Sequence, residues 1–142
     1  TLRLDPQRPN RVDLAAYRAN LRQMACLSQK AGIRPVFLTA PSNHQPGHEP
    51  EHLAGRHLRR LEELVPLHRA YVEATREVAQ ETKASLCDAA QTFDQAGAER
   101  DRYFRKDGIH LTEEGDQEMA KLLAGCIVAA LGIQRVTPAC AP

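Results

Sequence analysis

The sequence has no apolar run that approaches the roughly 20 residues needed to cross a bilayer, so no membrane-spanning helix is expected. Its first ten residues, TLRLDPQRPN, contain no hydrophobic core of the kind found in signal peptides. Neither sign of charge dominates, because 19 Lys and Arg face 18 Asp and Glu and leave a formal net charge of +1. The charge balance therefore gives no reason to expect a nucleic acid or an anionic membrane as a partner.

Closely spaced cysteines are also absent. Cys26, Cys87, Cys126 and Cys140 form no Cys-x-x-Cys pair, so neither a zinc knuckle nor a redox motif is indicated. The first three lie among apolar residues of predicted helices or a predicted strand, where a free cysteine packs as a small hydrophobic side chain. We favour this interpretation, with a disulfide as the alternative.

The length of the chain, 142 residues, is that of one ordinary domain. Because the chain begins at Thr1 and not at Met, we expect further sequence upstream that is not included here. We divide the chain into a lead segment at 1–12, a domain at 13–132 and a flexible tail at 133–142.

A helix and a buried strand are predicted first along the chain. Asp13 is a suitable N-cap for a helix that runs to about Ala31, with its apolar positions on one face. The short apolar run at 36–38 is closed by Pro41 and is typical of a buried parallel strand.

A loop, a long helical segment and a second strand are predicted next. Residues 42–55 are rich in Pro, Gly and His, which favours a loop. Helical periodicity then extends over 58–79, with a break expected at Pro66, which must start a second helix or kink a long one. A short strand is predicted around Leu86 and Cys87.

The rest of the chain is predicted to be a connection followed by one more helix. Residues 91–108 are polar and show no clear period, so we expect an irregular connection. Residues 113–131 carry an apolar stripe at helical spacing and give the clearest helix prediction.

This order of elements predicts an α/β fold with three α/β/α layers and a parallel sheet. Parallel strands are normally covered on both faces, and two strands do not make an independently stable sheet. We therefore expect the chain to supply the last two strands and at least three helices of a doubly wound domain.

The segment RKDGIHLTEEG, residues 105–115, has the composition of a catalytic acid and base. Asp107 and His110 are spaced so that the carboxylate can reach the near imidazole nitrogen, which leaves the far nitrogen free to accept a proton. Thr112 is a suitable cap for the following helix, and its first turn is acidic. Because ligands of parallel α/β sheets bind beyond the carboxyl ends of the strands, this position suits a catalytic loop.

The stretch YFRKDGIHLTEEGDQEMAKLLAGCI resembles the last block of the SGNH (GDSL-type) hydrolases, in which Asp-x-x-His precedes a Thr and a Gly-containing helix start. Upstream, YRANLRQMACLSQKAGIRPVFLTAP is similar to the helix and fourth strand of that family. YVEATREVAQETKASLCDAAQTF is similar to its next helix and fifth strand, so the resemblance covers most of residues 13–131.

The resemblance implies a flavodoxin-like α/β/α sandwich and ester hydrolysis through an acyl-enzyme, with His110 as the triad base and Asp107 as the acid that orients it. The Gly-Asp-Ser nucleophile block and the Gly-x-Asn-Asp block of the family do not occur in this sequence. We therefore expect the nucleophilic serine and the oxyanion donors to lie outside this chain, in a missing N-terminal half of the domain.

Three serines are candidate nucleophiles within the chain. Ser28 is placed in a helix and Ser85 at the start of a strand, which is the wrong end for catalysis. Ser42 follows the first strand, but its context is not the Gly-x-Ser-x-Gly elbow of a nucleophile. Because this loop should border the active site, Ser42, Asn43 and His44 are predicted to contact the substrate.

The histidine-rich loop raises the question of a metal site. His44, His48, His52 and His57 have metal-compatible spacing, but Pro46 and Pro50 interrupt any helix, so exposed loop histidines are favoured. No metal and no cofactor are expected. His68, on an apolar helical face, is predicted to be a packed core histidine.

The favoured hypothesis is a serine esterase of the SGNH type that acts on an acyl or acetyl ester of a small molecule or a carbohydrate. The alternative is a catalytically silent module of the same fold that binds a carbohydrate or a protein. A metal-binding domain built on the histidine-rich loop is the third hypothesis. Many bacterial members of the family are exported or tethered to membranes, so the resemblance also suggests an extracytoplasmic location.

Overall fold

The structure is a computed structural model that describes residues 11–53, 58 and 60–132. Its regular elements follow one another as helix, strand, helix, strand and two further helices, with short 3-10 segments between them. In chain order they are α1 Leu14–Lys30, β1 Val36–Leu38, η1 Glu51–Leu53, η2 Leu61–Glu63, α2 Leu64–Thr82, β2 Ser85–Cys87, α3 Ala89–Asp94, η3 Gly97–Tyr103 and α4 Glu113–Leu131. The predicted lead and tail lie largely outside the described residues.

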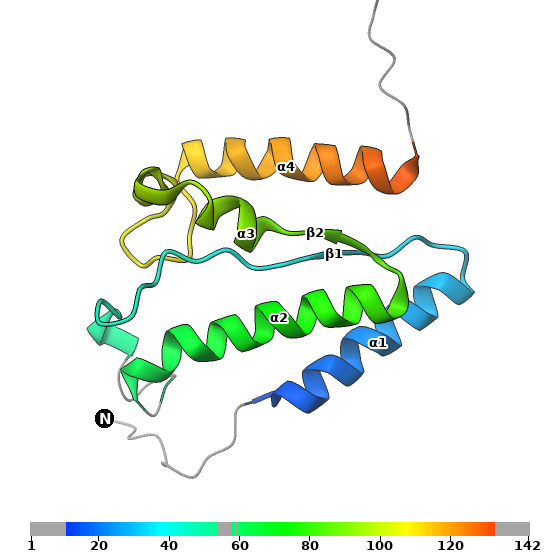
Figure 1. Cartoon of the computed structure of the whole chain (residues 1–142), viewed down its shortest axis with the longest axis horizontal. Coiled ribbons are helices and arrows are strands. Elements are labelled where there is room, and N and C mark those ends of the chain that lie inside the picture. The colour runs from blue at the N-terminus through cyan, green and yellow to red at the C-terminus, as the bar shows by residue number, and fades with distance from the viewer. Residues whose placement is uncertain (1–10, 54–57, 59, 133–142) are drawn as a thin grey trace, which may run out of the picture.

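The two strands are parallel neighbours, with Phe37 paired to Leu86 at the centre of the register. Helices α1 and α2 lie on one side of this small sheet and α4 lies on the other, which gives three layers (Figure 1). The predicted α/β/α arrangement with parallel strands is therefore confirmed. Val36 and Leu38 remain 37% and 42% exposed, as expected where two strands lack full cover.

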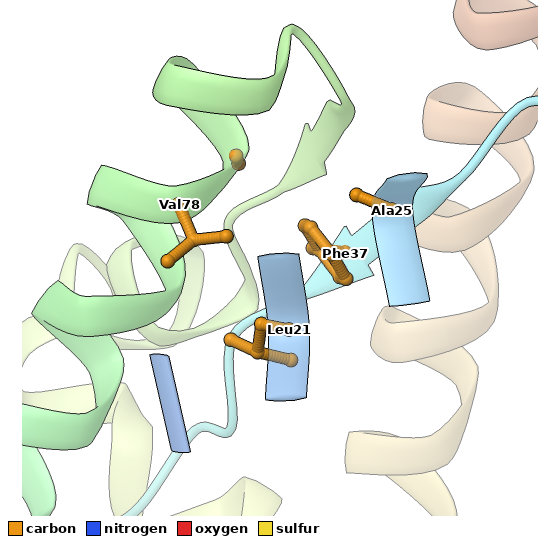
Figure 2. Close-up of a cluster of buried hydrophobic side chains, with 5 residues drawn as sticks. Leu21, Ala25, Phe37 and Val78 are labelled. Carbon is orange, nitrogen blue, oxygen red and sulfur yellow. The ribbon is translucent and has the colours of Figure 1, made fainter. Parts of the chain in front are cut away.

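Helix α1 begins where the sequence predicts, because the Asp13 carboxylate accepts a hydrogen bond of 2.7 Å from the Ala16 amide. Its inner face packs on α2 and β1 in a buried cluster that contains Leu21, Ala25, Phe37 and Val78 (Figure 2). These contacts join three elements that are distant in sequence, and their burial is the main hydrophobic stabilisation on this side of the sheet.

Pro66 is the third residue of α2, so the expected break falls at the start of the helix and not within it. Proline is tolerated in the first turn because the amide there has no partner inside the helix. The residues before Leu64 form the separate 3-10 segment η2. Of the two possibilities left open by the sequence, Pro66 therefore belongs to a helix start.

The expectation of an irregular connection over 91–108 is wrong as far as Tyr103, because α3 and η3 occupy most of this stretch. Asp88 caps a short helix, α3, by accepting a hydrogen bond of 3.2 Å from the Gln91 amide, and η3 follows. Phe93 of α3 is 1% exposed and packs with Phe104 against the inner side of α4. Six residues make fewer than two helical turns, which is too short for a visible hydrophobic period.

The interpretation of the cysteines as free apolar side chains is also wrong. Cys87 at the end of β2 and Cys126 on α4 form a disulfide, with their Cα atoms 5.6 Å apart. Cys26 is exposed and so does not pack in the core, and Cys140 lies outside the described residues. The bridge ties the last helix to the sheet across a sequence separation of 39 residues.

Removal of this bridge is expected to destabilise the fold. The double substitution Cys87→Ala and Cys126→Ala should lower the free energy of unfolding by about 2–4 kcal/mol, because a long loop of the unfolded chain is no longer closed. Urea denaturation measures the change, with Cys26→Ala as the matched control. A midpoint equal to that of the wild type under oxidising conditions would contradict the bridge.

The final helix has the predicted bounds, Glu113–Leu131, and Thr112 is its N-cap. Its Met119 and Leu122 pack toward Phe93 and Phe104, whereas Ile127 near its end is exposed. Among the described helices, none is both long and apolar enough to cross a membrane.

Candidate active site

The segment that carries Asp107 and His110 is a loop closed at its base by backbone pairing. Phe104 and Leu111 form an antiparallel bridge, and the Arg105 amide donates a hydrogen bond of 2.8 Å to the carbonyl of His110. The loop lies beyond α3, at the end of the sheet where both strands terminate (Figure 1). This is the edge at which parallel α/β folds bind ligands.

Asp107 accepts three hydrogen bonds within this loop. Its Oδ1 accepts from the amides of Ile109 and His110, at 3.0 and 2.9 Å. Its Oδ2 lies 2.8 Å from Nδ1 of His110. The predicted contact between the carboxylate and the near imidazole nitrogen is therefore present.

The hydrogen bonds also determine the charge of the aspartate and the tautomer of the histidine. The amides of His110 and Ile109, followed by the imidazole, hold the pKa of Asp107 well below its usual range. An ionised carboxylate only accepts hydrogen bonds, so Nδ1 of His110 carries the hydrogen and neutral His110 has its lone pair on Nε2. The imidazole side chain is 70% exposed, and Nε2 has no hydrogen-bond partner among the described residues.

Gly108 is required by the geometry of the loop for two reasons. Its φ of +73° lies in the left-handed region that favours glycine. A Cβ atom at this position would also lie 2.6 Å from Cδ2 of His44. Glycine in this predicted Asp-Gly turn therefore allows both the backbone conformation and the close approach of His44 from the loop after β1.

The predicted substrate-contacting residues lie beside this loop, and Asn43 and His44 bind it directly. The Asn43 amide donates a hydrogen bond of 2.8 Å to the carbonyl of Gly108, and Nε2 of His44 lies 2.7 Å from the carbonyl of Asp107. Ser42 Oγ accepts a hydrogen bond of 3.1 Å from the His44 amide. The structure thus brings Ser42, Asn43 and His44 together with the acid and base, and all three make contacts within the chain.

The side chain of Asn43 is fully engaged. Its Oδ1 accepts from Nε of Arg100 and its Nδ2 donates to Oδ1 of Asp101, both at 2.8 Å. Arg100 is in turn paired with Asp94 of α3. The loop after β1 is therefore held by η3 as well as by the loop that carries Asp107 and His110.

The start of α4 holds the carboxyl-terminal side of the loop that carries Asp107 and His110. Thr112 Oγ1 accepts from the Gly115 amide at 3.2 Å and donates to the carbonyl of Arg102 at 2.7 Å. A Cβ atom at Gly115 would lie 2.2 Å from the carbonyl oxygen of Tyr103, so only glycine allows the helix to start this close to η3. The Thr and Gly that follow His110 in the sequence thus have a steric and hydrogen-bonding role.

A buried polar network at the two strand ends was not predicted from the sequence. Thr39 is 1% exposed; its hydroxyl donates to Asp88 at 2.8 Å and accepts from the Ala90 amide at 2.9 Å. Arg76 of α2 donates two hydrogen bonds to the Asp88 carboxylate, at 2.8 and 3.0 Å. The sequence shows a polar residue directly after each strand, Thr39 and Asp88. No short sequence pattern identifies Arg76 of α2 as the partner of Asp88.

The network keeps Asp88 ionised. Burial alone would raise the pKa of Asp88, but hydrogen bonds from Arg76, Thr39 and the Gln91 amide lower it below its usual value. Asp88 therefore fixes the ends of both strands and the first turn of α3 through one charged group.

A cavity of about 540 Å³ lies next to the loop after β1. Its walls come from this loop, the first turns of α2, and α3 with η3, and include Ser42, His44, His68, Arg69, Asp94 and Arg100. His68 is half-buried and lines the cavity, which corrects its prediction as a packed core residue. Burial lowers the pKa of His68, so it is neutral at pH 7.

The histidine-rich loop is only partly described. Within the described part of the chain, no group of three His, Cys, Asp or Glu side chains is placed to hold a metal ion. His44 is engaged by Asp107 and His48 is exposed, whereas the side chain of His52 and the whole of His57 lie outside the description.

The other two serines are placed where the sequence predicts. Ser28 is in α1 and Ser85 begins β2, at the end of the strand opposite to Asp88 and to the Asp107–His110 loop.

The described chain thus has a parallel α/β/α arrangement with an exposed Asp107–His110 pair beyond its last strand. A family model described as GDSL-like Lipase/Acylhydrolase matches residues 5–123, and the chain belongs to this family. The predicted family resemblance is thus confirmed. No curated protein sequence gives a significant match.

Two solved structures share the fold. A lipase/acylhydrolase from Enterococcus faecalis aligns with a TM-score of 0.60 and 15% identity over 82% of this chain and 52% of that protein. A putative GDSL-like lipase from Parabacteroides merdae aligns with a TM-score of 0.59 and 16% identity over 85% of this chain and 50% of that protein. The chain therefore spans about half the length of these structures.

Proposed function

We propose that this chain supplies the acid and the base of a serine esterase that hydrolyses acyl or acetyl esters through an acyl-enzyme. The observation that carries the proposal is the 2.8 Å contact between Nδ1 of His110 and Oδ2 of Asp107, in a loop that leaves the imidazole exposed. Membership of a lipase/acylhydrolase family supports the same reaction class.

In the first half of the reaction, Nε2 of His110 removes the proton from a serine hydroxyl as the serine oxygen attacks the carbonyl carbon of the ester. The ionised Asp107 accepts the Nδ1 hydrogen and stabilises the imidazolium that forms. The tetrahedral intermediate then collapses, the bond to the alcohol oxygen breaks, and His110 returns its proton to the leaving alkoxide.

In the second half, a water molecule takes the place of the alcohol. His110 removes a proton from this water, whose oxygen attacks the acyl carbon, and the bond to the serine oxygen breaks. The proton returns from His110 to the serine, and the free acid leaves. Asp107 remains ionised throughout, so one histidine acts alternately as base and acid.

We place the nucleophilic serine outside this chain. Ser28 and Ser85 lie away from the carboxyl ends of the strands, and Ser42 accepts a hydrogen bond from the amide of a neighbouring loop residue. The chain covers only about half of each solved structure of similar fold, which supports a contribution of the nucleophile and oxyanion donors by sequence beyond residues 1–142.

Substrate contact is proposed for the loop at 42–44. Both polar atoms of the Asn43 amide are engaged by η3, and Nε2 of His44 is engaged by the catalytic loop. The Ser42 hydroxyl donates no hydrogen bond to the described residues, so it is the best placed of the three to bind an ester. The adjacent cavity has room for part of a small-molecule or carbohydrate ester.

A fluorophosphonate probe tests the proposed function on the complete protein. The probe should form one covalent adduct, which mass spectrometry of peptides should locate on a serine outside residues 1–142. Absence of any adduct on the folded protein would contradict the esterase and favour a silent module of the same fold. An adduct on Ser42 would contradict the proposed origin of the nucleophile.

A further inference from the structure

His44 makes an unusual contact for a residue of a surface loop. Its Nε2 lies 2.7 Å from the main-chain carbonyl of Asp107, a residue 63 positions further along the chain. The edge of its ring also lies against Gly108, as the 2.6 Å separation from a hypothetical Cβ atom shows. One side chain from the loop after β1 thus touches the proposed acid, Asp107, and the glycine that follows it.

The contact determines the tautomer of His44. A carbonyl oxygen only accepts hydrogen bonds, so Nε2 of His44 must carry the hydrogen. His110 has the opposite arrangement, because its hydrogen is on Nδ1 and points at a carboxylate. The two histidines therefore have different tasks: His110 presents a lone pair at Nε2, whereas His44 donates a hydrogen from the same ring position.

The hydrogen bond from His44 constrains the peptide plane that follows the Cα atom of Asp107. Together with the 2.8 Å bond from the Asn43 amide to the carbonyl of Gly108, it holds two successive carbonyls of the turn. The carboxylate of Asp107 shares its Cα atom with the first of them, so rotation of that peptide would move the carboxylate relative to His110.

We propose that His44 is a positioning residue for the Asp107–His110 pair and acts through its Nε2–H group. This inference rests on the proposed function, because it assigns a task to His44 in the same active site. His44 donates to the backbone of Asp107, fixes the direction of its side chain and so fixes the orientation of the imidazole base.

The test compares two substitutions with different hydrogen-bonding capacity in the complete protein. His44→Gln retains an N–H group at about the position of Nε2, whereas His44→Leu has a similar branch but no donor. His48→Leu is the matched control, since His48 is an exposed histidine of the same loop. Thermal melting establishes that each variant is folded before the other measurements are made.

The first readout is amide hydrogen exchange, which requires no activity. In the ¹⁵N-labelled protein, exchange at Gly108, Ile109 and His110 should be about 10-fold faster or more in His44→Leu than in the wild type and nearer to wild type in His44→Gln. Exchange that is unchanged in a folded His44→Leu variant would overturn the proposal, whether or not the protein is an esterase.

The second readout is ester hydrolysis. His44→Leu should lower kcat by about 10- to 100-fold with little change in KM, and His44→Gln should recover most of the loss. Equal losses in the Leu and Gln variants would overturn the role of the Nε2–H group. If His110→Ala had no effect on hydrolysis, the proposed function would fail, and the exchange data would still decide whether His44 holds the loop.

Discussion

Replacement of His110 by alanine is expected to lower kcat for a short activated ester by roughly 10⁴-fold or more in the complete protein, because no other group would take the serine proton. KM should change little, since the imidazole contributes to proton transfer and not to general binding. Steady-state hydrolysis of p-nitrophenyl acetate measures the effect.

The same substitution should leave the fold intact. The His110 side chain is 70% exposed, and the backbone amide that donates to Asp107 remains in the variant. The free energy of unfolding should therefore change by no more than about 0.5 kcal/mol. His48→Ala removes another exposed histidine and should retain wild-type kcat. A His110→Ala enzyme that works at nearly the wild-type rate would refute the assignment of the base.

Replacement of Asp107 by asparagine is expected to lower kcat by roughly 10³- to 10⁴-fold through a change of tautomer. The asparagine oxygen can still accept from the Ile109 and His110 amides, so the turn should persist. Its NH₂ group would then face Nδ1 of His110, which favours the imidazole with its hydrogen on Nε2. In that form Nε2 has no lone pair with which to take a proton from the nucleophile.

Nitrogen chemical shifts of the imidazole measure this tautomer directly, and hydrolysis measures its consequence. Asp116→Asn is the matched control, because Asp116 is an exposed aspartate in the first turn of α4. Wild-type tautomer together with wild-type kcat in the Asp107→Asn variant would show that the carboxylate does not orient the base.

The lowered pKa of Asp107 also determines how this loop responds to acid. The folded-state pKa lies below that of an aspartate in the unfolded chain, so the stabilisation is complete above about pH 4. It is lost as the pH falls through the lower folded-state value. Asp107 is therefore ionised at every pH at which a neutral imidazole could act as a base.

The sequence predicted the elements that have clear local signals. Helix α1 has a capping aspartate and helix α4 a capping threonine, and each carries apolar positions at helical spacing. Both strands are short apolar runs ended by polar or proline residues. These signals act over a few residues, which is why the bounds of these elements were predictable.

The remaining features depend on contacts between distant segments. Nothing in the spacing of four cysteines indicates that Cys87 and Cys126 are neighbours, because this requires α4 to pack on β2. Helix α3 was missed because its stability comes from Phe93 and the Asp88 cap.

In the site, the Asp107–His110 contact was predictable because it spans three residues. The sequence also predicted that the loops after the two strands meet at one edge, which placed Ser42, Asn43 and His44 near the pair. It could not predict that His44 binds a main-chain carbonyl, because every residue has such a carbonyl and the residue type does not indicate which one is bound. The link from Arg76 through Asp88 to Thr39 was not found either.

The closed base of the catalytic loop has an entropic consequence. The Phe104–Leu111 bridge and the Arg105–His110 hydrogen bond fix the backbone on both sides of the turn as the chain folds. In the proposed esterase, the conformational entropy lost in aligning carboxylate and imidazole is therefore lost once, during folding, and not at each encounter with an ester. Preorganisation of this kind leaves more of the binding free energy of the substrate for the alignment of its own carbonyl group.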